Sequence, residues 1–283
     1  IKRGHVLVNG EPQRRPGATV AETASVAIDD PAMAIELRLY FPERMQKDFT
    51  EQIEKHRLRR EIIATGLANS MINRCGPTYL VRMADRTGAD VGEITRAYVA
   101  LRDAFGLRDL FTEIDALDNR IPGKLQLDLY RVVQDLLHSR TAWALRNADF
   151  SKGVGPVVAA HAQSIAELRD ILTDALPAYM TERIAVLAAE YETHGVPQDL
   201  ARRLAALPEL GNVTDIYLVS RNAGVPIVSA AQTFFAVGEH FRIDRIGALA
   251  RTLPVTDYYD GLVLDQALET LSVAHRRIAS DVA

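Results

Sequence analysis

The chain has 283 residues, of which 48% are hydrophobic and 25% are charged, and its formal net charge is −4 at pH 7. This composition can supply the packed core of one large or two ordinary domains and excludes a disordered tail. The small negative charge gives no overall attraction to nucleic acid or to an anionic membrane. No stretch approaches the roughly 20 apolar residues that span a bilayer, and no apolar run of a secretory signal follows Ile1.

Cysteine and histidine usage points to a reducing compartment and to no structural metal. Cys75 is the only cysteine, so no intrachain disulfide can form. The seven histidines lack the Cys/His spacing of a structural zinc site. We therefore expect a cytoplasmic protein without a metal ion.

The amino-terminal part differs from the rest of the chain. Residues 1–27 are predicted to be an irregular lead-in or linker, in which residues 5–10 could form a short strand and turn and residues 12–17 are rich in helix-breaking residues. After Pro31, apolar residues recur almost everywhere at spacings of three and four. This pattern predicts an all-α fold, a multi-helix bundle.

The first long helix is predicted over residues 51–74. Its end is marked by Gly76, which suits a left-handed cap, and by Pro77, which cannot continue a helix. Asn69 falls within about 20° of Leu58 on the helical wheel, so we expect it to be buried and hydrogen-bonded. The predicted buried stripe consists of Leu58, Ile62, Thr65, Asn69 and Ile72.

Later helices are indicated by their caps. Asp90 and Glu93 have the spacing of a capping box, which predicts a helix over residues 90–105 that Gly106 ends. Pro122 is placed at the start of another helix, where its missing amide proton does no harm. Further helices are predicted over residues 107–117, 122–147, 159–176, 178–194, 198–207, 213–221, 226–240, 242–252 and 258–280.

Two helical halves are predicted, residues 28–150 and 151–283, joined by a hinge at residues 151–156, where two glycines and a proline interrupt hydrogen bonding. An internal repeat is one interpretation of the two halves. Placing Gly88 over Gly224 gives an offset of 136 (224 − 88), which aligns many identical or apolar residues without a gap. The competing explanation is a chance alignment of two amphipathic stretches with the same period.

The sequence shows no catalytic centre. A dinucleotide site needs a glycine-rich turn between a strand and a helix, and Gly153-Val154-Gly155 is followed at once by Pro156 and by no third glycine at the required place. Amino-acid dehydrogenases rely on a lysine with a lowered pKa, and no lysine lies in a setting that suggests one. We therefore predict that the chain contains no catalytic residue and no cofactor-binding residue.

The densest polar cluster lies on the first long helix, with a smaller one at Asp118-Asn119. The cluster is interpreted either as a solvated helix face or as a docking surface for a neighbouring domain or an anionic ligand. Asp118-Asn119 is interpreted as a helix-terminating turn, with a ligand site as the alternative. The candidate residues on the helix are His56, Arg57, Arg59, Arg60, Glu61, Asn69, Asn73 and Arg74.

Several of these segments resemble the carboxy-terminal region of the large bacterial NAD-specific glutamate dehydrogenases. The central landmark is residues 56–65 with 68–74 and Gly76-Pro77-Thr78, and supporting matches include Ala116-Leu117-Asp118-Asn119 and Gly195-Val196-Pro197. The landmarks keep the family's order over roughly residues 28–283. Cys75 departs from the small or apolar residue usual there, and residues 1–27 do not resemble the helical segment expected upstream.

The resemblance implies a parent enzyme that oxidatively deaminates L-glutamate to 2-oxoglutarate and ammonium with hydride transfer to NAD. The glutamate- and NAD-binding domains of that family precede this region, so the chain would be a non-catalytic helical domain serving packing, assembly or regulation. Its expected partners are the preceding catalytic domain of the same chain and further copies in a homo-oligomer. The alternative is a free-standing helical module that binds an anionic partner through the basic helix 55–74, although the net charge argues against nucleic acid.

Overall fold

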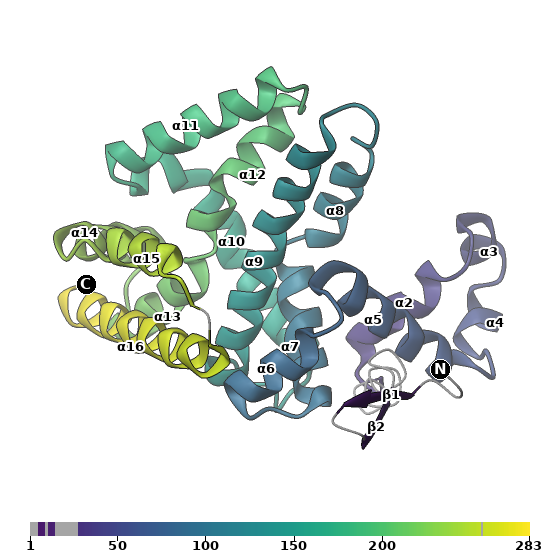
Figure 1. Cartoon of the computed structure of the whole chain (residues 1–283). Helices are drawn as coiled ribbons and strands as arrows, with labels where there is room; N and C mark the ends of the chain where they lie inside the picture. Colours follow the sequence, from purple (N-terminus) through teal and green to yellow (C-terminus); the bar gives the residue numbers. More distant parts are fainter. Residues whose placement is uncertain (1–4, 9–10, 15–27, 256) are drawn as a thin grey trace. The chain divides into compact units, whose positions relative to one another are not determined.

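Helices make up most of the protein. The computed structural model describes residues 5–8, 11–14, 28–255 and 257–283 (Figure 1). The strands β1 (His5–Val8) and β2 (Glu11–Arg14) pair antiparallel, with Val8 opposite Glu11. The remaining residues of the predicted lead-in lie outside the described part. From residue 28 on, every regular element described is helical, which confirms the predicted all-α multi-helix bundle.

The chain forms two compact units. One comprises the described residues of Ile1–Asp103 together with Leu137–Ala159, and the other comprises Ala104–Leu136 together with Ala160–Ala283. The long helices α9 (Gly123–Asn147) and α10 (Val154–Ala175) each contribute to both units. The predicted division into residues 28–150 and 151–283 stays a prediction.

The first unit contains short helices followed by longer ones. Its complete helices are η2 (Pro31–Met33), α2 (Ala34–Leu39), α3 (Glu43–Asp48), α4 (Thr50–Glu54), α5 (Arg59–Cys75) and α6 (Tyr79–Thr87), and most of α7 (Val91–Ala104) also belongs to it. The single helix predicted over residues 51–74 is wrong at its beginning, because the chain leaves the helix between Glu54 and Arg59. The ring of His56 accepts a hydrogen bond from the backbone amide of Leu58 at 3.1 Å, which competes with helical bonding there.

The second unit is a larger helical assembly. Its complete helices are α8 (Leu107–Asp115), α11 (Ala178–Thr193), α12 (Gln198–Leu210), α13 (Val213–Ala223), α14 (Ile227–His240), α15 (Ile243–Thr252) and α16 (Tyr258–Val282). The most extensive packing is of α11 against α12 and of α13, α14 and α16 against one another. These bounds follow the predicted helices closely, and α12 continues past its predicted end through Pro208.

The helix ends show why these predictions succeeded. The amide of Glu93 donates to Asp90 at 2.8 Å, and the amide of Asp90 donates to Glu93 at 2.9 Å, which confirms the predicted capping box before α7. Gly88 and Gly224 adopt left-handed conformations, with φ of 73° and 69°, where they end α6 and α13. A residue with a Cβ atom would be strained at either position.

The predicted hinge at residues 151–156 is only partly irregular. Val154, Gly155 and Pro156 already belong to the first turn of α10, where a proline costs no hydrogen bond. The carboxylate of Asp30 accepts hydrogen bonds from the amide of Val154 at 2.6 Å and from the amide of Ala32 at 3.0 Å. One side chain therefore caps the starts of both η2 and α10.

The helix bounds repeat at the predicted offset. Shifted by 136, α7 covers residues 227–240, which are the bounds of α14, and α8 begins at residue 243, where α15 begins. The shifted α9 and the observed α16 differ by one residue at each end. Gly106, with φ of 64°, corresponds to Arg242, with φ of 55°, so both copies turn through a left-handed residue at the same place. Superposition of the two copies stays a prediction.

Candidate functional site

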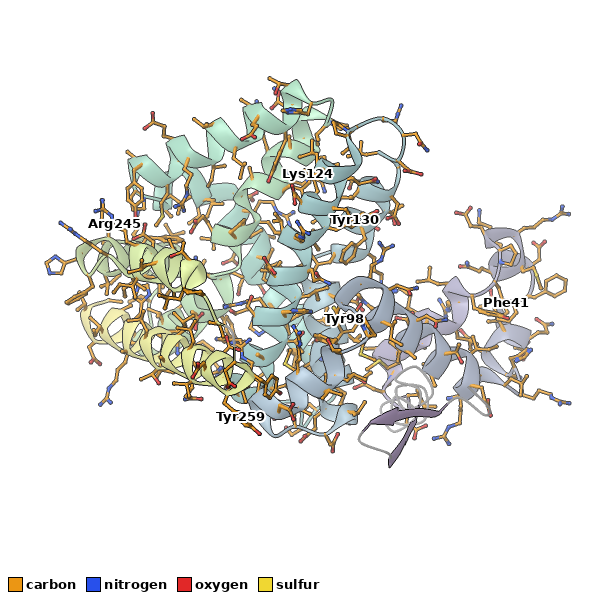
Figure 2. The ribbon with its side chains drawn as sticks, in the orientation of Figure 1. Phe41, Tyr98, Lys124, Tyr130, Arg245 and Tyr259 are labelled. Carbon is orange, nitrogen blue, oxygen red and sulfur yellow. The ribbon has the colours of Figure 1, made fainter. Side chains whose placement is uncertain are left out.

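The predicted polar cluster begins at the amino end of α5. The ring of His56 lies against Phe41, with centroids 5.8 Å apart, and is half-buried (Figure 2 labels Phe41). Arg57 and Arg59 are exposed and pair with no carboxylate among the described residues. Arg60 contacts Asp29 at 3.3 Å on the surface. Positive side chains at this end of a helix face the positive end of its dipole, which is unfavourable unless an anionic group lies nearby.

The expectation that Asn69 is buried is wrong. Its side chain is exposed, as are those of Glu61 and Asn73, while Arg74 is half-buried. The predicted buried stripe lies on a different face of α5 from the observed one. The prediction was ambiguous because α5 carries apolar side chains around more than half of its circumference. The face that is actually buried consists of Ile63, Ala64, Leu67, Ala68, Met71 and Cys75.

Asp118 and Asn119 belong to the second unit, whereas the candidate residues on α5 belong to the first. They lie in the turn between α8 and α9, and both are exposed. Asn119 has a φ of 60°, and its side-chain amide donates to the carboxylate of Asp118 at 3.2 Å. Asn tolerates this left-handed conformation better than most residues, so the pair ends α8 in the predicted turn.

A buried charge cluster in the first unit was missed at the sequence level. The guanidinium of Arg102 on α7 contacts Glu36 on α2 at 3.0 Å and Asp103 at 2.7 Å. It lies 5.4 Å from the ring centroid of Tyr98, which is labelled in Figure 2. Only 2% of the Arg102 side chain is exposed. Burial lowers the pKa of Arg102, but the hydrogen bond to Asp103 and the charges of both carboxylates outweigh this effect and raise it. The arginine therefore stays charged and joins α2 to α7.

The second unit contains a groove with a volume of about 950 Å³ between α8, α10, α11 and α12. Its lining is apolar at Leu110, Leu172 and Leu207, and its edge carries an ion pair between Arg203 and Glu113. The lining includes acidic side chains, such as Asp109 and Asp199, as well as basic ones, such as Arg169 and Arg202. The groove thus lacks the single sign of charge that would attract a phosphate or a dicarboxylate.

Cys75 is a buried thiol at the end of α5. Burial raises its pKa to about 12. We expect the native chain at pH 8 to react with Ellman's reagent far more slowly than the chain unfolded in urea, because the thiolate is the reactive form. A native thiol that reacts as fast as the unfolded one would contradict this placement.

No group of three or more His, Cys, Asp or Glu residues among the described residues could hold a metal ion. In the same part of the chain, no helix combines the length and the apolar character needed to cross a membrane.

The chain is similar to proteins named NAD-specific glutamate dehydrogenase. It is 29% identical to the one from Halomonas elongata over 242 residues, 29% identical to that from Pseudomonas aeruginosa over 261 residues, and 28% identical to that from Mycobacterium tuberculosis over 256 residues. These alignments cover 86%, 91% and 90% of this chain. They cover only 15%, 16% and 16% of the relatives, so the chain spans about a sixth of their length.

A family model described as glutamate dehydrogenase, C-terminal, matches residues 21–283. The match includes α5, the turn at Asp118 and both copies of the possible repeat. The chain therefore belongs to the glutamate dehydrogenase C-terminal family.

Proposed function

We propose that this chain is the non-catalytic helical region of a cytoplasmic, homo-oligomeric NAD-specific glutamate dehydrogenase. The parent enzyme would convert L-glutamate and water to 2-oxoglutarate and ammonium while a hydride passes to NAD. The observation that carries the proposal is the family match over residues 21–283, together with relatives of that name in which the matching segment is about a sixth of the whole. The remaining length of such an enzyme accommodates the glutamate- and NAD-binding domains.

The character of the lysines supports a non-catalytic role. A lysine that exchanges protons with an amino-acid substrate needs a buried setting that lowers its pKa. Lys47, Lys55, Lys124 and Lys152 are all exposed. The described strands and helices also include no strand-turn-helix unit that could bind a dinucleotide. NAD would therefore bind to the preceding domains.

We assign the docking of the preceding catalytic domain to α2 and the amino end of α5. Ile35, Leu39 and Tyr40 on and beside α2 expose much of their apolar surface to solvent. Arg57 and Arg59 follow in the adjoining turn and at the start of α5, which packs against α2. An acidic, partly apolar surface on the catalytic domain would cover the exposed apolar groups and offset the charge at the helix end.

Charge reversal in the complete enzyme tests this assignment. The double variant Arg57→Glu/Arg59→Glu is expected to lower glutamate oxidation several-fold or to lower the melting temperature of the enzyme, because two repulsive contacts replace two attractive ones. Steady-state kinetics and differential scanning calorimetry of the purified full-length enzyme measure both effects.

The matched control is Arg82→Glu, which reverses an exposed arginine on α6 and should leave both quantities unchanged. Wild-type activity and stability in the Arg57/Arg59 variant would remove this surface from the proposal.

A separate experiment tests the non-catalytic role. The 283-residue chain alone should not change the fluorescence of NADH. Saturable NADH binding by the chain alone would contradict that role.

A further inference from the structure

A pocket of about 430 Å³ lies in the second unit, among α11, α12, α14, α15 and α16 (Figure 1). Phe234 and Phe235 of α14 and Ile243 of α15 contribute to its apolar wall. A few polar and charged side chains also line it, and these are Arg183, Glu209, Asn212, Asp244 and His275. A hollow of this size with an apolar wall and a few polar groups is typical of a site for a small molecule.

A glycine leaves space in this pocket. Gly247 lines the pocket from α15, one turn after Ile243, and a Cβ atom on it would meet nothing within 4 Å outside its own stretch of helix. A glycine that allowed close packing of helices would have a neighbour at that distance. Glycine is also less favourable than alanine inside a helix. Close packing therefore does not explain Gly247.

The first copy of the possible repeat has a large side chain at the same position. At the offset of 136, Gly247 of α15 corresponds to Phe111 of α8. The ring of Phe111 is buried, and it stacks on Tyr130 with centroids 6.3 Å apart. The pocket of the second copy thus lies at a helical position that holds a buried aromatic ring in the first.

A second glycine of the pocket, Gly238, has its space filled by His275. A Cβ atom on Gly238 would lie 3.2 Å from the His275 ring, which stacks on Phe234 with centroids 3.9 Å apart. At the same offset, Gly238 corresponds to Arg102 and Phe234 to Tyr98, and Arg102 lies over the Tyr98 ring. Both copies therefore place a nitrogen-containing group on an aromatic ring here, and the open space of the pocket is the space beside α15.

The acceptors of the pocket include His275 and Asp244. The Nε2 atom of His275 donates to the carbonyl of Phe234 at 2.8 Å, which leaves Nδ1 of the neutral ring as an acceptor. Burial lowers the pKa of His275, which favours the neutral ring. Asp244 accepts a hydrogen bond from the hydroxyl of Tyr179 at 3.0 Å, and its second carboxylate oxygen can accept another.

The other charges that line the pocket compensate each other. Arg183 and Glu209 form an ion pair at 2.5 Å, and the side-chain amide of Asn212 donates to the same carboxylate at 3.4 Å. Asp244 forms no ion pair with a basic side chain in the described part of the chain. A flat ring that donates an N–H hydrogen bond to Asp244 would therefore suit both the space and the charge of the pocket.

We propose that this pocket binds a small heteroaromatic molecule that carries an N–H donor. Its ring occupies the space beside Gly247, and its N–H group donates to Asp244. Among the described helices, α11 packs extensively on α12 and α14 on α16, whereas no comparable packing joins these two pairs. A bound ring would contact both pairs and stabilise the folded chain. The site is independent of the proposed function, because it involves residues of the second unit alone.

Binding of indole to the complete 283-residue chain tests the site. Isothermal titration calorimetry is expected to show saturable binding of one indole per chain, and the melting temperature should rise with the indole concentration. Benzofuran has the same ring shape with an oxygen in place of the N–H group, so it should bind about tenfold more weakly or worse. Equal binding of both molecules, or no saturable binding of indole, would overturn the proposal.

Filling the space beside Gly247 tests the location of the site. Gly247→Phe should abolish indole binding, and without indole it should melt at or above the wild-type temperature, because phenylalanine favours a helix more than glycine does. The matched control Gly123→Phe changes an exposed glycine of α9 whose Cβ atom would also meet nothing within 4 Å. This control should bind indole like the wild type. Circular dichroism of each variant verifies that it is folded.

A second variant tests the acceptor without changing the size of the pocket. Asp244→Asn keeps the shape of the side chain and removes its charge, so it should weaken indole binding several-fold. The difference in affinity between indole and benzofuran should shrink by the same factor. Wild-type affinity for indole in either Gly247→Phe or Asp244→Asn would contradict the site.

Discussion

Arg102→Ala is expected to destabilise the protein by about 3–5 kcal/mol, because it removes the guanidinium that contacts the buried carboxylate of Glu36. Glu36 is only 7% exposed, so water cannot replace the lost guanidinium. The variant also removes the arginine from its position over the ring of Tyr98. Urea unfolding followed by circular dichroism measures the change in the free energy of unfolding.

A second variant removes both charges without opening a cavity. Arg102→Met/Glu36→Gln keeps most of the side-chain volume and removes both charges, so it should be much closer to the wild type than Arg102→Ala. If both variants lost the same stability, the cavity could not be responsible, and the loss of the charged contacts themselves would be. A loss below about 1 kcal/mol in Arg102→Ala would contradict the burial of this pair.

Acid is expected to destabilise the protein through His161. This histidine on α10 lies edge-on to the ring of Tyr217, with centroids 5.1 Å apart, and burial lowers its pKa from 6.5 to about 4. Below pH 6.5 the unfolded chain binds a proton that the folded chain does not, so stability rises with pH between about 4 and 6.5. The contribution is fully present above pH 6.5 and amounts to about 3 kcal/mol from the difference in pKa.

Unfolding free energies measured at several pH values, for the wild type and for His161→Phe, check this expectation. The variant should lose most of the dependence between pH 4 and 6.5. Some dependence should remain, because burial also lowers the pKa of His275, opposed by its hydrogen bond to the carbonyl of Phe234 and by the charge of Asp215. Identical pH profiles for the two proteins would show that His161 is not the responsible group.

The helices themselves could be predicted because their ends are encoded locally. Asp90 and Glu93 bond to each other's backbone amides within one turn, and Gly88 and Gly224 adopt conformations that few other residues tolerate. Neither signal depends on distant parts of the chain. The break at residues 55–58 was missed because nothing in that segment is a strong helix breaker, and the bond from Leu58 to His56 becomes visible only in the structure.

The rotation of each helix about its axis is a tertiary property, and the sequence did not reveal it for α5. Leu67 and Met71 form the buried face, whereas Asn69 between them points to solvent. The apolar surroundings of Arg102, from Ala97 to Ala104, were the one available signal for a buried charge, because a surface arginine seldom interrupts so apolar a stretch. The partner, Glu36, lies too far away in sequence to be paired with it by spacing.

The side chain of Asp30 caps two helices, so the amino end of α10 depends on a residue that precedes the first helix. Its carboxylate binds the amide of Val154, 124 residues further along the chain, and lies 3.0 Å from where a Cβ atom on Gly153 would be. A fragment that begins after Asp30 would therefore expose the first turn of α10 as well as shorten the amino terminus. A shortened protein that begins at Ala34, where α2 begins, would lack this carboxylate.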